Sequence, residues 1–105
     1  MKNERDNLER GGGLIRQKRN EQGLTLREVA EDLGITRMYL SEIERGKKGA
    51  PDDQLLNIIK TLNLDELELF TAYGRISPKI KAYLLENEDD LKVLYRRATN
   101  PTRIK

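Results

Sequence analysis

The sequence has no cysteine and no histidine among its 105 residues, and this excludes several kinds of chemistry. Disulfide bonds, thiolate nucleophiles, the usual zinc clusters and imidazole acid–base catalysis each need one of these two residue types. Ser41 and Ser77 are the only serines, and neither can have a histidine base beside it. We therefore predict a protein that is not an enzyme and that uses no metal or other cofactor.

Aromatic residues and long apolar runs are also scarce. The chain has no tryptophan, one phenylalanine and four tyrosines, so its core must be built mainly from aliphatic side chains. No apolar run approaches the roughly 18 residues of a membrane span, and the N-terminal stretch MKNERDNLERGGG lacks the apolar segment of a signal peptide. A chain of this length builds one core. We expect a soluble, cytoplasmic protein that makes no contact with a membrane.

Neither sign of charge is in large excess, because the chain has 20 basic and 18 acidic residues and a net charge of +2. Any surface for nucleic acid must therefore come from local clustering of charge. Residues 37–48 carry four basic side chains against two acidic ones, and the stretch from Lys92 to the end of the chain is basic with no acid. Each stretch is either a surface for anions or a solvated helix end.

Apolar residues recur at helical spacing along most of the chain and predict an all-α fold. Thr25 with Glu28 has the pattern of a capping box, Gly34 ends that helix, and Thr36 is the N-cap of the next one. The charged N-terminus runs into a glycine triplet and predicts a flexible arm over residues 1–12, and residues 100–105 are predicted to form a loose tail. The predicted helices cover about residues 14–22, 25–33, 36–45, 51–62, 65–74, 77–85 and 89–98.

The second and third of these helices are joined by a very short turn at Gly34, which is typical of a helix-turn-helix. Ala30 is small enough for a close crossing, and Leu40 and Ile43 fall on one face, which we expect to point inward. In this arrangement the second helix of the motif can lie in the major groove of DNA. The outward positions, which are the candidates for contact with bases, are Thr36, Arg37, Met38, Ser41 and Glu42.

The segment GLIRQKRNEQGLTLREVAEDLGITRMYLSEIERGKKGAPDDQLLNIIKTLNLDELELF, with its Ile43-Glu44-Arg45-Gly46 signature, resembles the DNA-binding domain of the xenobiotic-response-element regulators, the family of the lambda and 434 repressors. The likeness covers about residues 13–73. It implies a five-helix bundle whose third helix reads DNA, followed here by two more helices. We therefore divide the chain into the arm at 1–12, a helix-turn-helix domain at 13–74, a two-helix extension at 75–99 and the tail at 100–105.

The resemblance also implies roles for charged residues. Arg19 and Glu44 match a structural ion pair of the family. Glu42 accepts a hydrogen bond from cytosine, selects against unsuitable sequences by its negative charge, or holds Arg37 or Arg45 in place. Many members have a phosphate-binding glutamine at the position of Leu26, so that contact is either absent here or replaced by a neighbouring residue, Thr25 or Arg27. The expected phosphate contacts are Thr25, Arg27, Arg45, Lys47 and Lys48.

The predicted extension carries more apolar side chains than a solvated pair of helices needs. It packs either on the fourth and fifth helices of its own chain or across a two-fold axis in a homodimer, as is common for proteins that bind palindromic DNA. The candidate interface residues are Ile80, Tyr83, Leu84, Leu91, Leu94 and Tyr95. The function predicted first is a dimeric repressor that reads double-stranded DNA. The alternative is a protein-interaction module, such as an antitoxin, anti-repressor or adaptor, that binds a regulatory partner protein through the extension.

Overall fold

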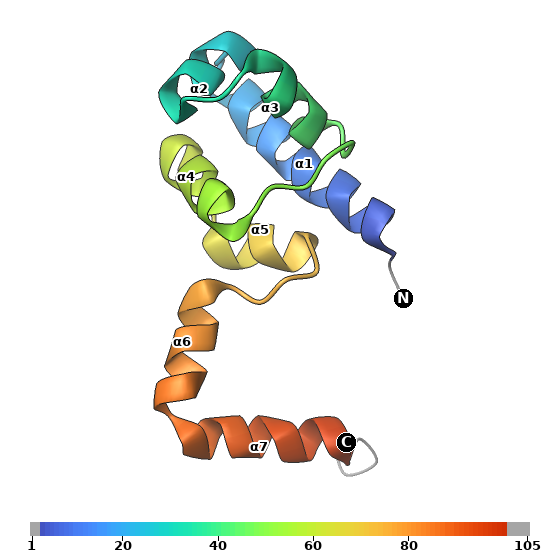
Figure 1. The fold of residues 1–105 in the computed structure, drawn as a ribbon, viewed down its shortest axis with the longest axis vertical. Helices are drawn as coiled ribbons and strands as arrows, with labels where there is room; N and C mark the ends of the chain where they lie inside the picture. The colour runs from blue at the N-terminus through green and yellow to red at the C-terminus, as the bar shows by residue number, and fades with distance from the viewer. Residues whose placement is uncertain (1–2, 101–105) are drawn as a thin grey trace.

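The computed structural model describes residues 3–100, and every regular element in that range is a helix, which confirms the all-α prediction. Five helices form a bundle, and the last two project away from it (Figure 1). None of the helices in the described range combines the length and the apolar content that a membrane span requires. The elements are α1 (Glu4–Glu21), α2 (Leu26–Leu33), α3 (Arg37–Glu44), α4 (Asp52–Leu62), α5 (Glu66–Ala72), α6 (Pro78–Glu86) and α7 (Glu88–Thr99).

Both ends of α2 and the start of α3 follow the capping residues that the sequence predicted. Thr25 accepts a hydrogen bond from the backbone N–H of Glu28, and the Glu28 carboxylate accepts one from the backbone N–H of Thr25, so the capping box is complete. Gly34 ends α2 in the left-handed conformation at φ 70°, which glycine adopts at little cost. Thr36 then caps α3 by accepting from the N–H of Tyr39 at 3.0 Å. The turn between α2 and α3 is therefore fixed at both ends.

The core of the bundle is aliphatic apart from one phenylalanine and one tyrosine. Side chains from all five bundle helices meet in it, and most of them are wholly buried. Burying a side chain of this size contributes about 1.5–3 kcal/mol relative to leaving it in water. The fully buried large members are Ile15, Val29, Leu40, Ile43, Leu55, Ile58, Leu62, Leu69 and Phe70.

The predicted flexible arm is wrong for residues 4–12, because α1 begins at Glu4 and continues without a break through the glycine triplet. Asn3 caps the helix by accepting from the N–H of Asp6 at 2.8 Å, and the acidic Glu4 and Asp6 lie in the first turn, where they complement the helix dipole. Residues 1–2 of the expected arm, and residues 101–105 of the expected tail, lie outside the described residues.

Tight packing explains why two positions within α1 are occupied by glycine. Gly11 and Gly12 are buried: a side chain on Gly11 would overlap the ring of Tyr73, and one on Gly12 would overlap the backbone carbonyls at the end of α3. Glycine in a helix costs about 1 kcal/mol relative to alanine, and here the close approach of α1 to α3 and α5 offsets that cost. The glycines allow helices to cross closely rather than making the chain flexible.

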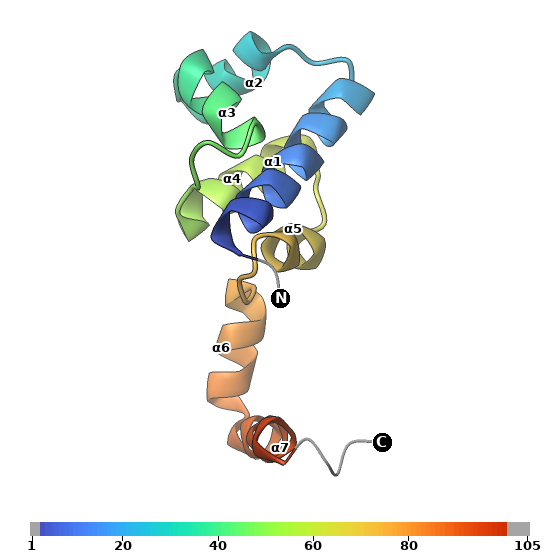
Figure 2. The ribbon, with the colours of Figure 1, turned by 90° about the vertical axis from the view of Figure 1, so that its right-hand side faces the viewer.

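The two C-terminal helices form an arm that stands clear of the bundle (Figures 1 and 2). No residue of α6 or α7 is buried, so the extension does not pack on the fourth and fifth helices of its own chain. The radius of gyration is 16.2 Å, whereas a compact chain of about this length has roughly 13 Å. The arm therefore leaves its apolar side chains uncovered in the monomer.

The start of the arm is attached to the bundle by polar contacts. Arg75 donates to the carbonyl oxygen of Ala50 at 2.7 Å and to the carboxylate of Asp52 at 3.1 Å. The hydroxyl of Ser77, which is buried and caps α6, donates to the carboxylate of Glu66. These contacts fix the direction in which α6 leaves the bundle.

Candidate nucleic-acid interface

The helix-turn-helix is built by the packing of α3 across α2. Val29 and Ala30 of α2 are buried against Leu40 and Ile43 of α3, and the backbone N–H of Ile35 donates to the carbonyl of Ala30 at 3.0 Å across the turn. The inward face of α3 is thus the one that its sequence predicted. Its opposite face is left toward solvent.

The first turn of α3 presents two long exposed side chains, Arg37 and Met38, and Met38 keeps 72% of its surface exposed. The hydroxyl of Thr36, just before them, is used in capping the helix. No acidic residue lies in this first turn. The positive end of the α3 dipole and the cation of Arg37 therefore act together on any anion or hydrogen-bond acceptor in front of the helix.

The next turn of α3 is occupied by contacts within the chain. The hydroxyl of Ser41 accepts from Nε of Arg45 at 3.3 Å, and Oε1 of Glu42 lies 3.3 Å from Nζ of Lys48. Both Ser41 and Glu42 are half-buried. Of the three roles left open for Glu42, holding a cation agrees with its position, although the cation is Lys48 rather than Arg37 or Arg45.

A group of cations follows the end of α3. Arg45, Lys47 and Lys48 are exposed, and Gly46 between them has φ 73°. The backbone N–H of Lys47 donates to the carbonyl of Glu42 at 2.8 Å, which turns the chain back along the helix end. The three expected phosphate-binding side chains in this segment therefore lie on one stretch of surface next to α3. Arg45 and Lys48 are restrained only by their weak contacts with Ser41 and Glu42.

The beginning of α2 is less suited to a phosphate. The carboxylate of Glu28 already receives the N–H of Thr25, so a negative charge of the chain itself stands at this helix N-terminus. Leu26 packs against the core and offers no hydrogen bond in place of the usual glutamine. Arg27 is exposed and is the cation of this turn. Among the expected contacts at this end, Arg27 has the chemistry for a phosphate, while Thr25 is engaged in the capping box.

Arg19 and Glu44 are brought together in the structure as a buried ion pair. Nε and Nη2 of Arg19 donate to the two carboxylate oxygens of Glu44 at 2.8 and 2.9 Å, and Nη1 donates to the carbonyl of Leu24 at 2.8 Å. These hydrogen bonds to Glu44 raise the pKa of Arg19 above its ordinary value. The pair joins α1 to the end of α3 and holds the exposed face of α3 in position.

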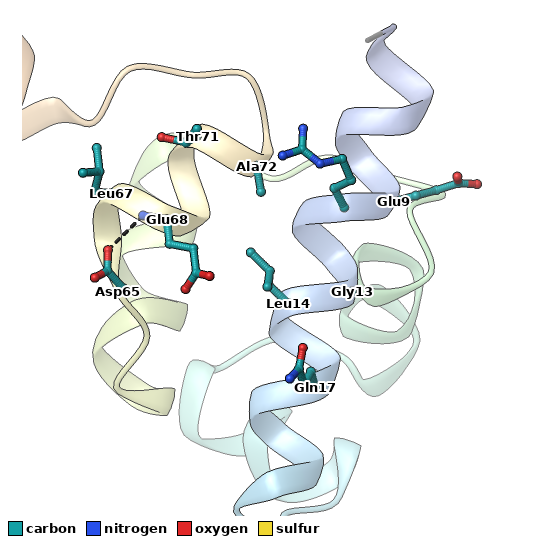
Figure 3. Close-up of a pocket in the computed structure, with 10 residues that line it drawn as sticks. Glu9, Gly13, Leu14, Gln17, Asp65, Leu67, Glu68, Thr71 and Ala72 are labelled. Carbon is teal, nitrogen blue, oxygen red and sulfur yellow. Dashed lines mark hydrogen bonds between the residues drawn. The ribbon is translucent and has the colours of Figure 1, made fainter.

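A groove of about 950 Å³ lies between α1 and α5, on the side of α1 turned away from α3 (Figure 3). Leu14 and Leu67 contribute its apolar surface. Glu9, Asp65 and Glu68 line it together with a single cation, Arg10. This excess of carboxylates makes the groove unfavourable for phosphate groups. Within residues 3–100 no three acidic side chains are grouped closely enough to hold a metal ion.

Two contacts at this candidate interface were not predicted from the sequence. The Ser41–Arg45 contact has the i, i+4 spacing at which helical neighbours meet, and that spacing was available in the sequence. The Glu42–Lys48 pair joins residues six apart, and it forms only because the chain turns back after α3. No helical spacing predicts that pair.

The helix-turn-helix family model HTH_3 matches residues 15–69, which is more than half of the chain and includes α2, α3 and the cations after α3. The chain belongs to this helix-turn-helix family. Among curated relatives in the family, it is 48% identical over 50 residues to the transcriptional regulator ClgR of Mycobacterium tuberculosis, covering 48% of this chain and 44% of that protein. It is 36% identical over 70 residues to the HTH-type transcriptional regulator SlrR of Bacillus subtilis, covering 66% of this chain and 46% of that one.

A solved structure has the same fold over a larger share of the molecule. The crystal structure of the clp gene regulator ClgR from Corynebacterium glutamicum aligns with a TM-score of 0.58 at 28% identity, covering 95% of this chain and 97% of that one. This chain spans about half the length of the curated relatives that it matches. The likeness to those relatives covers 48% and 66% of this chain.

Proposed function

We propose that this protein is a sequence-specific DNA-binding transcriptional regulator of the cytoplasm, a homodimer that represses by occupying a palindromic operator. The observation that carries the proposal is the division of α3 into two faces. Leu40 and Ile43 fix one face in the core, and Arg37 and Met38 stand exposed on the other. The relatives named as transcriptional regulators support the same function.

In this proposal α3 lies in the major groove with its first turn toward the bases. Arg37 pairs with the O6 and N7 acceptors of guanine, a contact that gives about 1–3 kcal/mol of discrimination against other bases. The cations Arg27, Arg45, Lys47 and Lys48 meet phosphates on both sides of the groove. Four phosphate contacts from each protomer give a slope of log affinity against log salt of about −7 for a dimer.

The exposed arm supports a dimer. Leu91, Leu94 and Tyr95 of α7 keep 39, 48 and 68% of their surface exposed, and Ile80 and Tyr83 of α6 keep 43 and 53%. Leu84, the sixth candidate, is half-buried. Exposed apolar surface on this many side chains of two neighbouring helices is unfavourable in water and favours association. A second copy carries the same surface, and a two-fold axis lets the two arms cover each other.

Selection of bound sequences from a random duplex library tests the DNA-reading part. The wild type is expected to enrich a palindrome, and Arg37→Ala is expected to lose the guanine of each half-site. Arg10→Ala is the matched control, because it removes the same charge from an exposed position on the α1–α5 groove, away from α3. An unchanged motif with Arg37→Ala, or no motif from the folded wild type, would contradict the proposal.

Sedimentation equilibrium tests the dimer. The wild type is expected at twice the 12.2 kDa monomer mass, and Leu94→Asp is expected at the monomer mass with its helix content retained, since nothing in α7 is buried. Leu67→Asp places the same charge on another exposed leucine, in the α1–α5 groove, and should stay dimeric.

The uncovered arm also favours a second candidate function, binding of a regulatory protein by α6 and α7. A wild type that is monomeric at all concentrations would favour this function over the homodimer.

A further inference from the structure

We propose that the protein recognises the C5-methyl group of a pyrimidine in the major groove, and that Met38 is the side chain that contacts it. This inference rests on the proposed function, in which α3 reads DNA, and it adds the chemistry of one recognised group. It concerns the part of the DNA-reading face that has no charge and no hydrogen-bonding capacity.

The first observation is the exposure of Met38. Its 72% is the largest exposed fraction of any large apolar side chain in the described residues, and the other such side chains lie on α5 or farther along the chain. A single exposed apolar residue is ordinary on a protein surface. This one, however, is the second residue of α3, directly after Arg37, on the face left free by the packing of Leu40 and Ile43.

The second observation is that the polar side chains of the same face are in use. Thr36 caps the helix, Ser41 accepts from Arg45, and Glu42 lies against Lys48. Arg37 is the one outward polar side chain of α3 that no hydrogen bond or ion pair of the described residues engages. The reading surface of α3 therefore consists of one cation and one apolar chain side by side.

The chemistry of the major groove supplies a matching group. Arg37 fits the acceptors of guanine, whereas the apolar feature that the unmodified base pairs present in this groove is the thymine C5-methyl. A methylated cytosine carries the same methyl at the same ring position. The unbranched, polarisable chain of methionine adapts its shape to such a group. Met38 thus selects for the methyl group itself. The experiment below distinguishes the two bases that carry this group, thymine and 5-methylcytosine.

The experiment starts from the palindrome that the library selection identifies. In synthetic duplexes each thymine is replaced in turn by deoxyuridine, which removes the methyl and leaves every hydrogen-bonding group. At one position per half-site the wild type is expected to lose affinity about fourfold, the value for one buried methyl group, and about 15-fold when both half-sites are changed. Met38→Ala is expected to bind both duplexes equally, with the affinity of the wild type for the deoxyuridine duplex.

A second pair of duplexes separates the two sources of the methyl. At the sensitive position the thymine pair is replaced by cytosine or by 5-methylcytosine. Tighter binding of the 5-methylcytosine duplex by the wild type, and not by Met38→Ala, assigns recognition to the methyl of either base. If the wild type distinguishes thymine from deoxyuridine but does not distinguish 5-methylcytosine from cytosine, the recognised methyl group is that of thymine.

Arg37→Ala is the control on the neighbouring residue, because it should bind more weakly yet still distinguish thymine from deoxyuridine. Equal binding of thymine and deoxyuridine by the wild type at every position overturns the inference about Met38, even if the palindrome and its dependence on Arg37 stand. Failure to select any palindrome would instead be a failure of the proposed function.

Discussion

Replacing Gly12 with alanine should destabilise this protein, although alanine is the better helix former. Gly12 lies where α1 crosses the end of α3. A methyl carbon there would stand 2.7 Å from the carbonyl oxygen of Glu44 and closer still to that of Ile43. Both neighbours are backbone atoms, so a side-chain rotation cannot relieve the overlap, and the two helices must move apart.

The size of the effect follows from two opposing contributions. Alanine gains about 1 kcal/mol over glycine in a helix interior. Overpacking of a tightly packed site costs about 1–3 kcal/mol, and a clash with two carbonyl groups lies at the upper end of that range. We expect Gly12→Ala to lower the free energy of unfolding by about 1–2 kcal/mol in total. For a domain of this size, each kcal/mol corresponds to roughly 4–8 °C in Tm.

The neighbouring glycine is the matched control. Gly13 is exposed, and a methyl group on it would have no atom within 4 Å, so Gly13→Ala should raise the free energy of unfolding by up to about 1 kcal/mol. Urea unfolding followed by circular dichroism, at one protein concentration for all variants, measures both changes. If both substitutions stabilise to the same extent, α1 does not cross α3 at Gly12, and the packing described above is wrong.

Three further predictions concern stability. Glu44→Gln should lower the free energy of unfolding by about 3–5 kcal/mol, because it leaves the buried charge of Arg19 without its partner; a loss below 1 kcal/mol in urea titrations would mean that the pair is solvated. Burial raises the pKa of Tyr73 to about 12, whereas a tyrosine in the unfolded state has a pKa of about 10. As the pH rises, the unfolded state therefore loses this proton before the folded state does. The free energy of unfolding should fall between about pH 10 and 12 by roughly 1.4 kcal/mol per unit of pH. In Tyr73→Phe this part of the alkaline loss should vanish, and an unchanged pH profile would show that Tyr73 ionises freely in the folded state. Thr25→Ala should cost about 1 kcal/mol through loss of the capping box, and a urea midpoint equal to that of the wild type would speak against that cap.

Much of the fold could be predicted because its elements are specified locally. The capping box at Thr25, the glycine at the end of α2 and the cap at Thr36 each depend on residues within four positions of one another. The burial of Leu40 and Ile43 follows from helical spacing alone. The same local rules placed Arg37 and Met38 on the outward face of α3.

The errors arose where distant segments meet. A run of three glycines is typical of a flexible linker, and no local feature shows that Tyr73 and the end of α3 fill the space beside Gly11 and Gly12. The partner of Glu42 likewise depends on the path of the chain after α3. Contacts of this kind need the tertiary structure, because spacing within one helix says nothing about what crosses it.

The attachment of the arm has a consequence for the arrangement of a target site. Arg75 and Ser77 fasten the start of α6 to the bundle, and few residues separate α5 from α6. In a dimer joined through the arms, each α3 would therefore be held at a set distance and a set rotation from the other. One extra base pair between half-sites turns one of them by about 35° around the duplex axis, since a turn holds roughly 10–10.5 base pairs. A protein with this attachment should tolerate changes in the sequence between its half-sites far better than changes in their helical phase.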